Sequence, residues 1–447
     1  MQGTTCGTPK AGQLDPTFGM QGKVFLRFEN GLQIIQAGAV AIRPDGKILV
    51  AGAATNDASE SMYGLARLNA DGSVDAGFGN AGIVTGVFKK GHEASASSVL
   101  LLEDNGVILV GRHVENRDPR ITYRALARFD EAGDLVATFG NNGVVVLDRD
   151  LVPDLHLPPT PNEKELREPP GKSGSSRDAP HGARQIAGIA GDKIFVNETF
   201  GPTAVIFKLN LQDGQLDPGF NGIGYVALAF PSVYTSLDQL ALHNSQITCG
   251  GNYTTTEQNR PLLARYNEDG SLDTSLGEEG YVVVPKGSEP YESISCTDMV
   301  RQDTDGRLVY VGSSLPLGTP DVHCVILVRN ADGGANPQFN HGEALFTAVG
   351  EQGAQWTGVH VDPLSRMILV VGNTLGSGTD IIVGRCDESG NWDTSFGPEG
   401  WILIDIDHNI DAALGSALQP DGKLLICGLA FNEEQTGYTG FVARVQG

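Results

Sequence analysis

Residues 65–84 read LARLNADGSVDAGFGNAGIV, and variants of this stretch recur along the whole chain. The shared part is Leu-Asp-x-x-Phe-Gly-x-x-Gly. Seven copies align, with leading positions Asp15, Asp75, Val136, Asp217, Asp273, Asn336 and Asp393. The intervals between these positions are 60, 61, 81, 56, 63 and 57 residues. Such a steady period indicates that one supersecondary unit is repeated through the chain.

Three residues after each leading position the chain places a large apolar side chain. It is Leu276 in the fifth copy and otherwise Phe18, Phe78, Phe139, Phe220, Phe339 or Phe396. We expect these rings to fill the space between neighbouring units, because burying one Phe stabilises a fold by roughly 1.5–3 kcal/mol. The Leu before the Asp should face the same space. The repeated carboxylates should brace the turn through nearby backbone N–H groups; they are Asp15, Asp75, Asp217, Asp273 and Asp393.

Two short apolar runs recur with the motif, as in KILVAG (47–52) and GLARL (64–68). Together with the segments before and after them, they give four strand-like runs per unit. Asp-Gly pairs stand at the tight hairpins, and no helical period extends beyond two turns. Four short strands in units of about 60 residues predict a β-propeller, an all-β fold.

The two ends of the chain predict how the ring closes. The chain begins at a copy of the motif followed by GKVFLRF (22–28), and it ends on FVARV (441–445), the run that normally precedes the motif. We therefore expect the N-terminal strand to pair with the C-terminal blade, which removes an open edge. Six internal units and this composite unit predict one domain, residues 1–447, with seven four-stranded blades.

The pattern Leu-Ala-Arg-x-x-x-x-Gly-x-Leu-Asp-x-x-Phe-Gly-x-x-Gly resembles the delta-60 repeat family of bacterial β-propeller-like proteins. The resemblance covers essentially the whole chain, with departures at Val136, Leu276 and residues 331–344. The resemblance implies a β-propeller fold but indicates no particular activity or ligand. Members of such a family are expected as free-standing soluble monomers or as parts of a secreted or surface assembly.

Charge narrows the classes of partner. The chain has 31 Lys and Arg against 54 Asp and Glu, a net charge of −23, which disfavours nucleic acids and anionic membranes. No window of 18 apolar residues predicts a membrane span. Residues 1–12 lack the pattern of a signal peptide, so we expect a cytoplasmic protein or one exported by a non-Sec route. The six Cys form no C-x-x-C pair and are expected as free, buried side chains.

The Asp-rich turns raise the question of calcium. Asn69, Asp71 and Asp75 offer oxygens at i, i+2 and i+6, as in part of a Ca²⁺ loop. No acidic residue follows at the distance of a closing ligand. Turn bracing is the favoured interpretation, Ca²⁺ is the alternative, and no other cofactor is predicted.

Binding is expected on the face that carries the irregular loops, because variable loops on a rigid ring commonly hold function. These loops are residues 55–61, 113–121, 253–261, 314–322 and 431–438. The longest departure, residues 149–183, is rich in Pro and charge, and it is either a tolerated insertion or a partner-binding arm. We therefore predict a non-catalytic scaffold for a protein partner.

Two alternatives use other residues. A metal-dependent hydrolase would place its site in the central channel, where Asp238, Asp298, Gln355, Trp356 and His360 are the candidate binding residues. That reading rests on analogy at the level of the fold, and no catalytic residue is assigned. A carbohydrate-binding lectin would use exposed aromatic residues near the loops, for which the candidates are Tyr63, Tyr123 and Tyr438.

Overall fold

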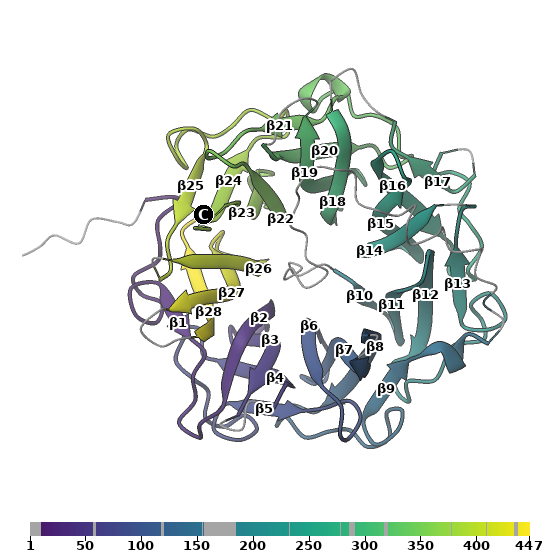
Figure 1. Ribbon diagram of the computed structural model, residues 1–447, viewed down its shortest axis with the longest axis vertical. Coiled ribbons are helices and arrows are strands. Elements are labelled where there is room, and N and C mark those ends of the chain that lie inside the picture. The colour runs from purple at the N-terminus through teal and green to yellow at the C-terminus, as the bar shows by residue number, and fades with distance from the viewer. Residues whose placement is uncertain are drawn as a thin grey trace, which may run out of the picture.

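The computed structural model describes most of the chain, and Figure 1 shows it as a ring of sheets around a central channel. The described residues are 10–56, 60–117, 120–153, 155, 185–231, 233–277, 279–285, 291–316, 321–376, 378–407, 409–432 and 437–447. They form seven four-stranded antiparallel sheets. The predicted seven-bladed β-propeller is therefore confirmed.

Each blade is a meander whose strands follow one another outward from the channel. The first blade contains β2 (Gln33–Ile42), β3 (Ile48–Thr55), β4 (Met62–Leu68) and β5 (Ile83–Gly86). The second contains β6 (Ala94–Leu101), β7 (Val107–Arg117), β8 (Arg120–Phe129) and β9 (Val144–Leu147). The third contains β10 (Ala187–Ala190), β11 (Lys193–Phe200), β12 (Thr203–Asn210) and β13 (Tyr225–Leu228).

The next three blades follow the same plan. The fourth contains β14 (Tyr234–His243), β15 (Gln246–Thr254), β16 (Asn259–Tyr266) and β17 (Tyr281–Val283). The fifth contains β18 (Tyr291–Arg301), β19 (Leu308–Pro316), β20 (His323–Arg329) and β21 (Leu345–Thr347). The sixth contains β22 (Ala354–Val361), β23 (Ile368–Thr374), β24 (Ile381–Cys386) and β25 (Trp401–Ile404). Two short 3₁₀ turns, η1 (Arg149–Leu151) and η2 (Asn340–Gly342), lie in connections.

The closing blade joins the two ends of the chain. It is made of β26 (Ile410–Leu418), β27 (Leu424–Asn432), β28 (Gly437–Val445) and, as outer strand, β1 (Lys23–Phe25). β1 runs antiparallel to β28, with Lys23 opposite Ala443 and Phe25 opposite Phe441. In Figure 1 the purple N-terminal strand accordingly lies beside the yellow C-terminal one. The predicted closure of the ring is confirmed.

A bulge in six inner strands explains the Gly that ends the apolar run of the neighbouring second strand. Six inner strands shift register at the same place, where one residue is left unpaired. The residue before the bulge lies opposite a glycine of the second strand, as Cys296 lies opposite Gly312. A Cβ on Gly312 would stand 1.8 Å from the carbonyl oxygen of Ser295. Only glycine permits this close approach of two backbones.

The repeated Phe lies at the junction between blades. Phe18, Phe78 and Phe139 are fully buried. The Phe78 ring lies against Gly133 in the turn of the second blade, and the Gly79 N–H donates to the carbonyl of Ala132 at 2.9 Å in that turn. The hydrophobic cluster at this junction accordingly combines residues of the first and second blades.

The residue before the Asp was expected to share this buried space, and in two copies that prediction is wrong. Val74 is 39% exposed and Leu135 is 43% exposed. The reason is local. Gly82, the closing glycine of the motif, adopts φ +99°, and its missing Cβ leaves the space that Val74 occupies. The side chain therefore covers its own turn and does not enter the junction between blades.

The Asp of the motif binds an Arg of the preceding strand. Arg67 Nε donates to Asp75 Oδ2 at 2.6 Å, and Arg67 Nη1 donates to the carbonyl of Glu131 in the next blade at 2.7 Å. The guanidinium also lies 4.6 Å from the centroid of the Phe78 ring. The other carboxylate oxygen of Asp75 accepts from the Gly77 N–H at 3.2 Å. Each such unit, here called an Arg-Asp latch, thus ties a turn to its own blade and to the next.

Several remaining expectations concern the chain as a whole. Cys249, Cys296, Cys324, Cys386 and Cys427 are free and buried as predicted, and Cys6 lies outside the described residues. Within the part that the structure describes, no helix is long and apolar enough to cross a membrane. Most of the 149–183 segment lies outside the described residues.

Candidate functional site

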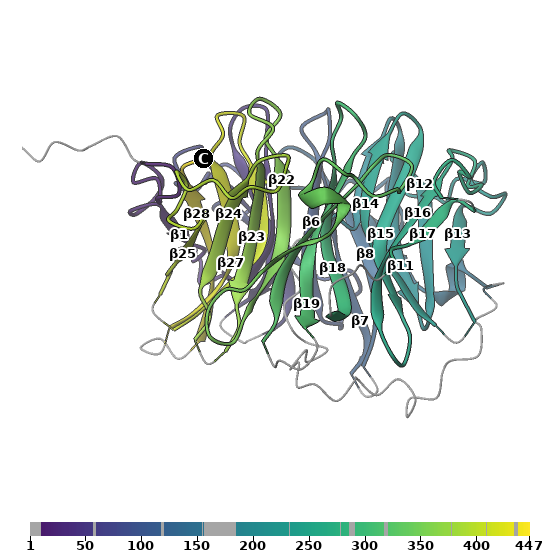
Figure 2. The same cartoon turned by 90° about the horizontal axis from the view of Figure 1, so that it is seen from above.

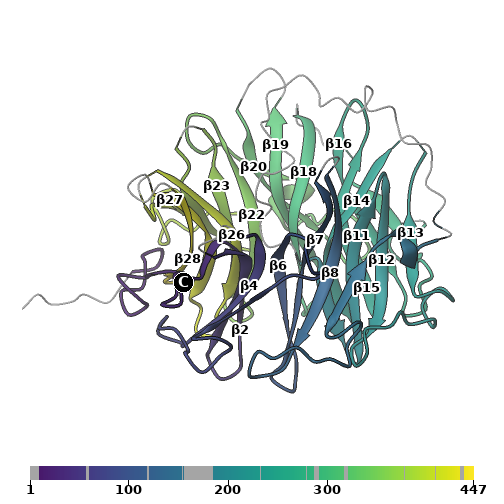
Figure 3. The same cartoon turned by 60° about the horizontal axis from the view of Figure 1, so that its bottom comes forward.

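The two sides of the ring differ. Connections from second to third strands, and from an outer strand to the next inner strand, lie on one side, here called the loop face. It is at the bottom of Figure 2 and at the top of Figure 3. The opposite side, the turn face, carries the tight hairpins and the Arg-Asp latches.

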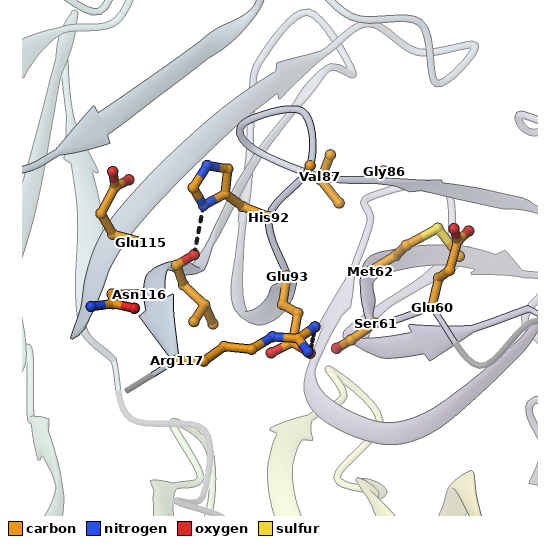
Figure 4. A pocket seen from close by; sticks show the side chains of 12 residues that line it. Glu60, Ser61, Met62, Gly86, Val87, His92, Glu93, Glu115, Asn116 and Arg117 are labelled. Carbon is orange, nitrogen blue, oxygen red and sulfur yellow. Dashed lines mark hydrogen bonds and ion pairs between the residues drawn. The ribbon is translucent and has the colours of Figure 1, made fainter. Parts of the chain in front are cut away.

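A pocket of about 750 Å³ opens on the loop face between the first and second blades (Figure 4). Its walls are residues 60–62, 86–87, 91–93 and 114–117. They come from the β3–β4 connection with the start of β4, from the end of β5 with the β5–β6 connection, and from the end of β7. Two of the loops predicted to vary, 55–61 and 113–121, therefore contribute to one cavity.

Backbone hydrogen bonds hold the walls of the pocket together. The Val114 N–H donates to the carbonyl of Glu93 at 3.0 Å, and the Ala94 N–H donates to the carbonyl of Ser61 at 3.3 Å. In the β7–β8 ladder the register shifts around Glu115, which is the extra residue of a β-bulge. Bulges of this kind re-aim a side chain. Here the bulge lies beside the pocket wall.

Two histidines and a glutamate gather at this wall. His113 is fully buried on β7, and its Nε2 lies 2.7 Å from Glu115 Oε2. Within the described residues, His113 Nδ1 is buried without a hydrogen-bond partner. The rings of His92 and His113 lie 4.8 Å apart between centroids. One ligand atom from each of His92, His113 and Glu115 can be chosen so that all three lie within 4.8 Å of one another.

Hydrogen bonding fixes the tautomer of neutral His92. Its Nδ1 lies 3.0 Å from the carbonyl oxygen of Val114, the contact drawn as a dashed line in Figure 4. A carbonyl oxygen only accepts, so Nδ1 must carry the proton. The other nitrogen, Nε2, then has a free lone pair, which is the form in which imidazole binds metals.

Glu115 is held as a carboxylate. Hydrogen bonds from His113 and then from Lys89 lower its pKa to about 2. Lys89 Nζ lies 3.1 Å and 3.0 Å from its two oxygens. Glu115 is therefore ionised at neutral pH and is already a site that attracts cations.

The candidate channel residues occupy mainly structural positions. Asp298 Oδ2 accepts from the Val359 N–H of the neighbouring inner strand at 3.0 Å. His360 Nε2 lies 2.8 Å from Ser416 Oγ of the closing blade, and burial lowers the pKa of His360 to about 4. Trp356 is fully buried in the cluster between the fifth and sixth blades.

The two remaining channel candidates, Gln355 and Asp238, are half-buried on inner strands. Gln355 lies on β22, and Asp238 is the bulge residue of β14. Asp298 and Ser416, the partner of His360, both approach Gly358, whereas Trp356 lies in the core. Among the described residues, none of these side chains belongs to a group of three His, Cys, Asp or Glu side chains spaced to hold a metal.

The calcium candidates are already engaged in the turn. Asp75 Oδ2 binds Lys47 at 2.7 Å as well as Arg67. Asp71 Oδ1 accepts from the Ser73 N–H and hydroxyl, and Asn69 Nδ2 donates to the Ser73 hydroxyl. A calcium ion at this turn would have to displace two cationic side chains from Asp75.

Among the aromatic candidates for a lectin site, Tyr63 is too deeply buried to stack on a sugar. It is 3% exposed and packs 5.0 Å from Phe88, and burial raises the pKa of Tyr63 to about 12. Tyr438, at the start of β28, is 46% exposed.

Sequence reasoning missed the pocket cluster. His92 and His113 are 21 residues apart, and one lies in a loop while the other lies in a strand. The one available signal was the pair His113 and Glu115, which alternate on a strand as H-x-E.

Comparisons with known proteins agree with the architecture. Residues 43–78 and 246–276 match a family model described as a domain of unknown function (DUF5122) β-propeller. Both segments run from a first-to-second-strand region into the Phe-Gly motif, which supports a β-propeller family. No curated protein sequence matches the chain.

Solved structures of similar fold are distant in sequence. A protein of unknown function from Dyadobacter fermentans is 11% identical over 96% of this chain and all of that one, with a TM-score of 0.46. A polysaccharide lyase, an ulvan lyase, is 11% identical over 95% of this chain and 94% of that one, with a TM-score of 0.46. Drosophila semaphorin 2a is 9% identical over 98% of this chain and 77% of that one, with a TM-score of 0.50. At such identities the likeness concerns the fold alone.

Proposed function

We propose that the protein is a non-catalytic scaffold that binds a protein partner on its loop face. The observation that carries this proposal is the pocket between the first and second blades, which is built by two irregular connections and the end of β7 (Figure 4). The turn face, by contrast, is occupied by repeated turns and Arg-Asp latches that hold the ring together. A rigid ring with irregular loops on one side is suited to binding.

The charges around the pocket favour a polar partner surface. Arg117 is 77% exposed and binds Glu93 at 2.6 Å, while Lys89 and Glu115 form a second exposed pair. Exposed pairs of this kind contribute little to stability and are free to exchange partners. Because the whole chain carries a charge of −23, a partner with a basic surface would be steered toward it.

The test compares two charge reversals of equal size. Glu60→Lys changes the pocket rim, and Glu268→Lys changes an exposed position on the turn face. Proteins that the wild-type chain captures from extracts of the source cells are identified and purified, and their affinities for all three chains are measured by calorimetry. We expect Glu268→Lys to match the wild type and Glu60→Lys to weaken binding about tenfold or more.

Equal affinity of the three chains for every purified candidate would overturn the assignment to the loop face. Failure to capture any protein that binds the purified wild-type chain would overturn the scaffold proposal itself.

A further inference from the structure

We propose that His92, His113 and Glu115 form a binding site for a divalent transition-metal ion at the wall of the loop-face pocket. Two imidazole nitrogens and one carboxylate are a donor set that suits Zn²⁺ and related ions. This inference does not depend on the scaffold proposal, because the three side chains belong to one chain and need no partner to meet.

The proton positions prepare the site. Neutral His92 must donate from Nδ1 to the Val114 carbonyl, so its Nε2 is an unprotonated donor. Metal-binding histidines characteristically use this arrangement, in which one nitrogen is oriented by a backbone carbonyl and the other binds the ion. In Figure 4 the second nitrogen of His92 lies on the side of the ring away from the dashed hydrogen bond.

The distances require only a small contraction. One ligand atom from each of the three side chains can be chosen so that all three lie within 4.8 Å of one another. Bonds of about 2.0–2.2 Å to a tetrahedral ion place its donors roughly 3.4 Å apart. His92 lies in a loop and Glu115 is a bulge residue near the end of β7, so both can move by this amount. His113 Nε2 and Glu115 Oε2, now 2.7 Å apart, would separate slightly to admit the ion between them.

His113 can supply its Nε2 to the ion. His113 is fully buried, yet Nδ1 lacks a hydrogen-bond partner among the described residues. Nδ1 is not the nitrogen that faces Glu115, so it can carry the ring proton while the lone pair of Nε2 binds the ion. Glu115 meanwhile binds the ammonium group of Lys89, a single positive charge where a divalent ion would carry two.

Three protein ligands leave a fourth position. His92 and Glu115 both line the pocket, so this position would face the cavity. A water molecule, or a carboxylate or imidazole of a bound partner, is the chemical class of ligand that would complete the coordination.

The experiment titrates the purified full-length protein with Co²⁺, followed by visible absorption, and with Zn²⁺, followed by calorimetry. The variants are His92→Ala and Glu115→Gln, which alter side chains that are not fully buried and should leave the fold intact. His243→Gln, a histidine at the turn-face end of β14, is the matched control. Lys89→Gln removes the competing cation.

We expect one saturable site in the wild-type chain and in His243→Gln, at least tenfold weaker binding in His92→Ala and Glu115→Gln, and tighter binding in Lys89→Gln. Mg²⁺ should not compete, because it prefers all-oxygen sites. The proposal fails if the wild-type chain shows no saturable binding, or if His92→Ala and Glu115→Gln bind as tightly as His243→Gln. A loss of protein capture with metal binding intact would count against the scaffold and not against the metal site.

Discussion

Arg67 shows how one side chain joins two blades. Its guanidinium binds the Asp75 carboxylate and a carbonyl of the next blade, and it stacks over Phe78. Arg444 with Asp15, and Arg265 with Asp273, repeat this latch with Nε to Oδ2 distances of 2.8 Å. Because both partners are nearly buried, removing one of them leaves the other as a buried charge without a counter-ion.

The fifth blade provides a natural control for this latch. There the leading position is Asn336, and Arg329 Nε is buried without a hydrogen-bond partner in the described part of the chain. We predict that Arg265→Met lowers the free energy of unfolding by about 3–5 kcal/mol, because it leaves the buried Asp273 carboxylate without a counter-ion. Arg329→Met leaves no carboxylate of the motif unpaired, so it should lower the free energy of unfolding far less. Denaturant unfolding of both variants measures the difference, and equal losses would refute the role given to the ion pair.

Asp411, on the inner strand of the closing blade, gives a pH-dependent prediction. It is almost fully buried, and its Oδ2 accepts from the N–H groups of Ile406 and Asp407, while Oδ1 has no hydrogen-bond partner among the described residues. Burial raises the pKa of Asp411 to about 6. Between pH 4 and 6 the folded protein therefore binds more protons than the unfolded chain, so ionised Asp411 destabilises the native state above that range.

Asp411→Asn removes the destabilisation that the buried, ionised Asp411 carboxylate causes above pH 6. We predict a gain of about 2–3 kcal/mol in the free energy of unfolding at pH 8, which shrinks as the pH falls through 6 and vanishes near pH 4. Thermal unfolding of both proteins across this range measures it. A gain that is the same at pH 4 and pH 8 would show that the substitution acts through packing and not through the charge.

At the scale of elements, strands and hairpins were predictable, and their irregularities were not. The period of about 60 residues and the Asp-Gly turns indicated four strands per unit. The bulge found in six of the inner strands left no mark in the alternation of side chains, yet it accounts for glycines such as Gly312, whose position the sequence did display. Arg67 was visible in the same way, as part of Leu-Ala-Arg, but its partner Asp75 lies eight residues further on and meets it only after the chain has turned.

Gly312→Ala tests the bulge. The new Cβ would stand 1.8 Å from the Ser295 carbonyl oxygen, so a backbone must shift. We predict a loss of stability of roughly 3 kcal/mol or more, in the range of strained backbone and overpacked sites. Gly77→Ala is the control, because its Cβ meets the Asp75 carboxylate at an ordinary 3.4 Å. Melting temperatures compare the two, and a Gly312→Ala variant as stable as Gly77→Ala would contradict the explanation.

The pocket cluster marks the limit of what sequence alone can give at this scale. His92 precedes β6, while His113 and Glu115 lie on β7, and Ala94 pairs with His113 across the ladder. The cluster therefore depends on the register of two strands and on a bulge. Neither can be derived from a list of histidines and their spacing.

At the scale of the whole molecule, the ring separates stability from binding. Latches and repeated turns occupy the turn face, and irregular loops occupy the loop face (Figures 2 and 3). Metal binding at the loop face should therefore stabilise the ring without changing it. We predict that Zn²⁺ at 100 times its dissociation constant for the wild-type chain raises the free energy of unfolding by about 2.7 kcal/mol, and that the same Zn²⁺ concentration raises that of His92→Ala by about 1.4 kcal/mol or less. Thermal unfolding with and without the ion measures it, and an equal gain in both proteins would indicate binding elsewhere.

The central claim is that a closed ring, completed by the N-terminal strand, holds the loop face in place. Deleting residues 1–28 removes β1 together with Asp15 and Phe18, and leaves Arg444 buried without its carboxylate. Calorimetric melting of this protein, with deletion of residues 1–9 as control, is the most direct test. The account predicts a melting temperature lower by roughly 10 °C or more for the longer deletion and no change for the shorter one. Equal melting temperatures for the two deletions would contradict it.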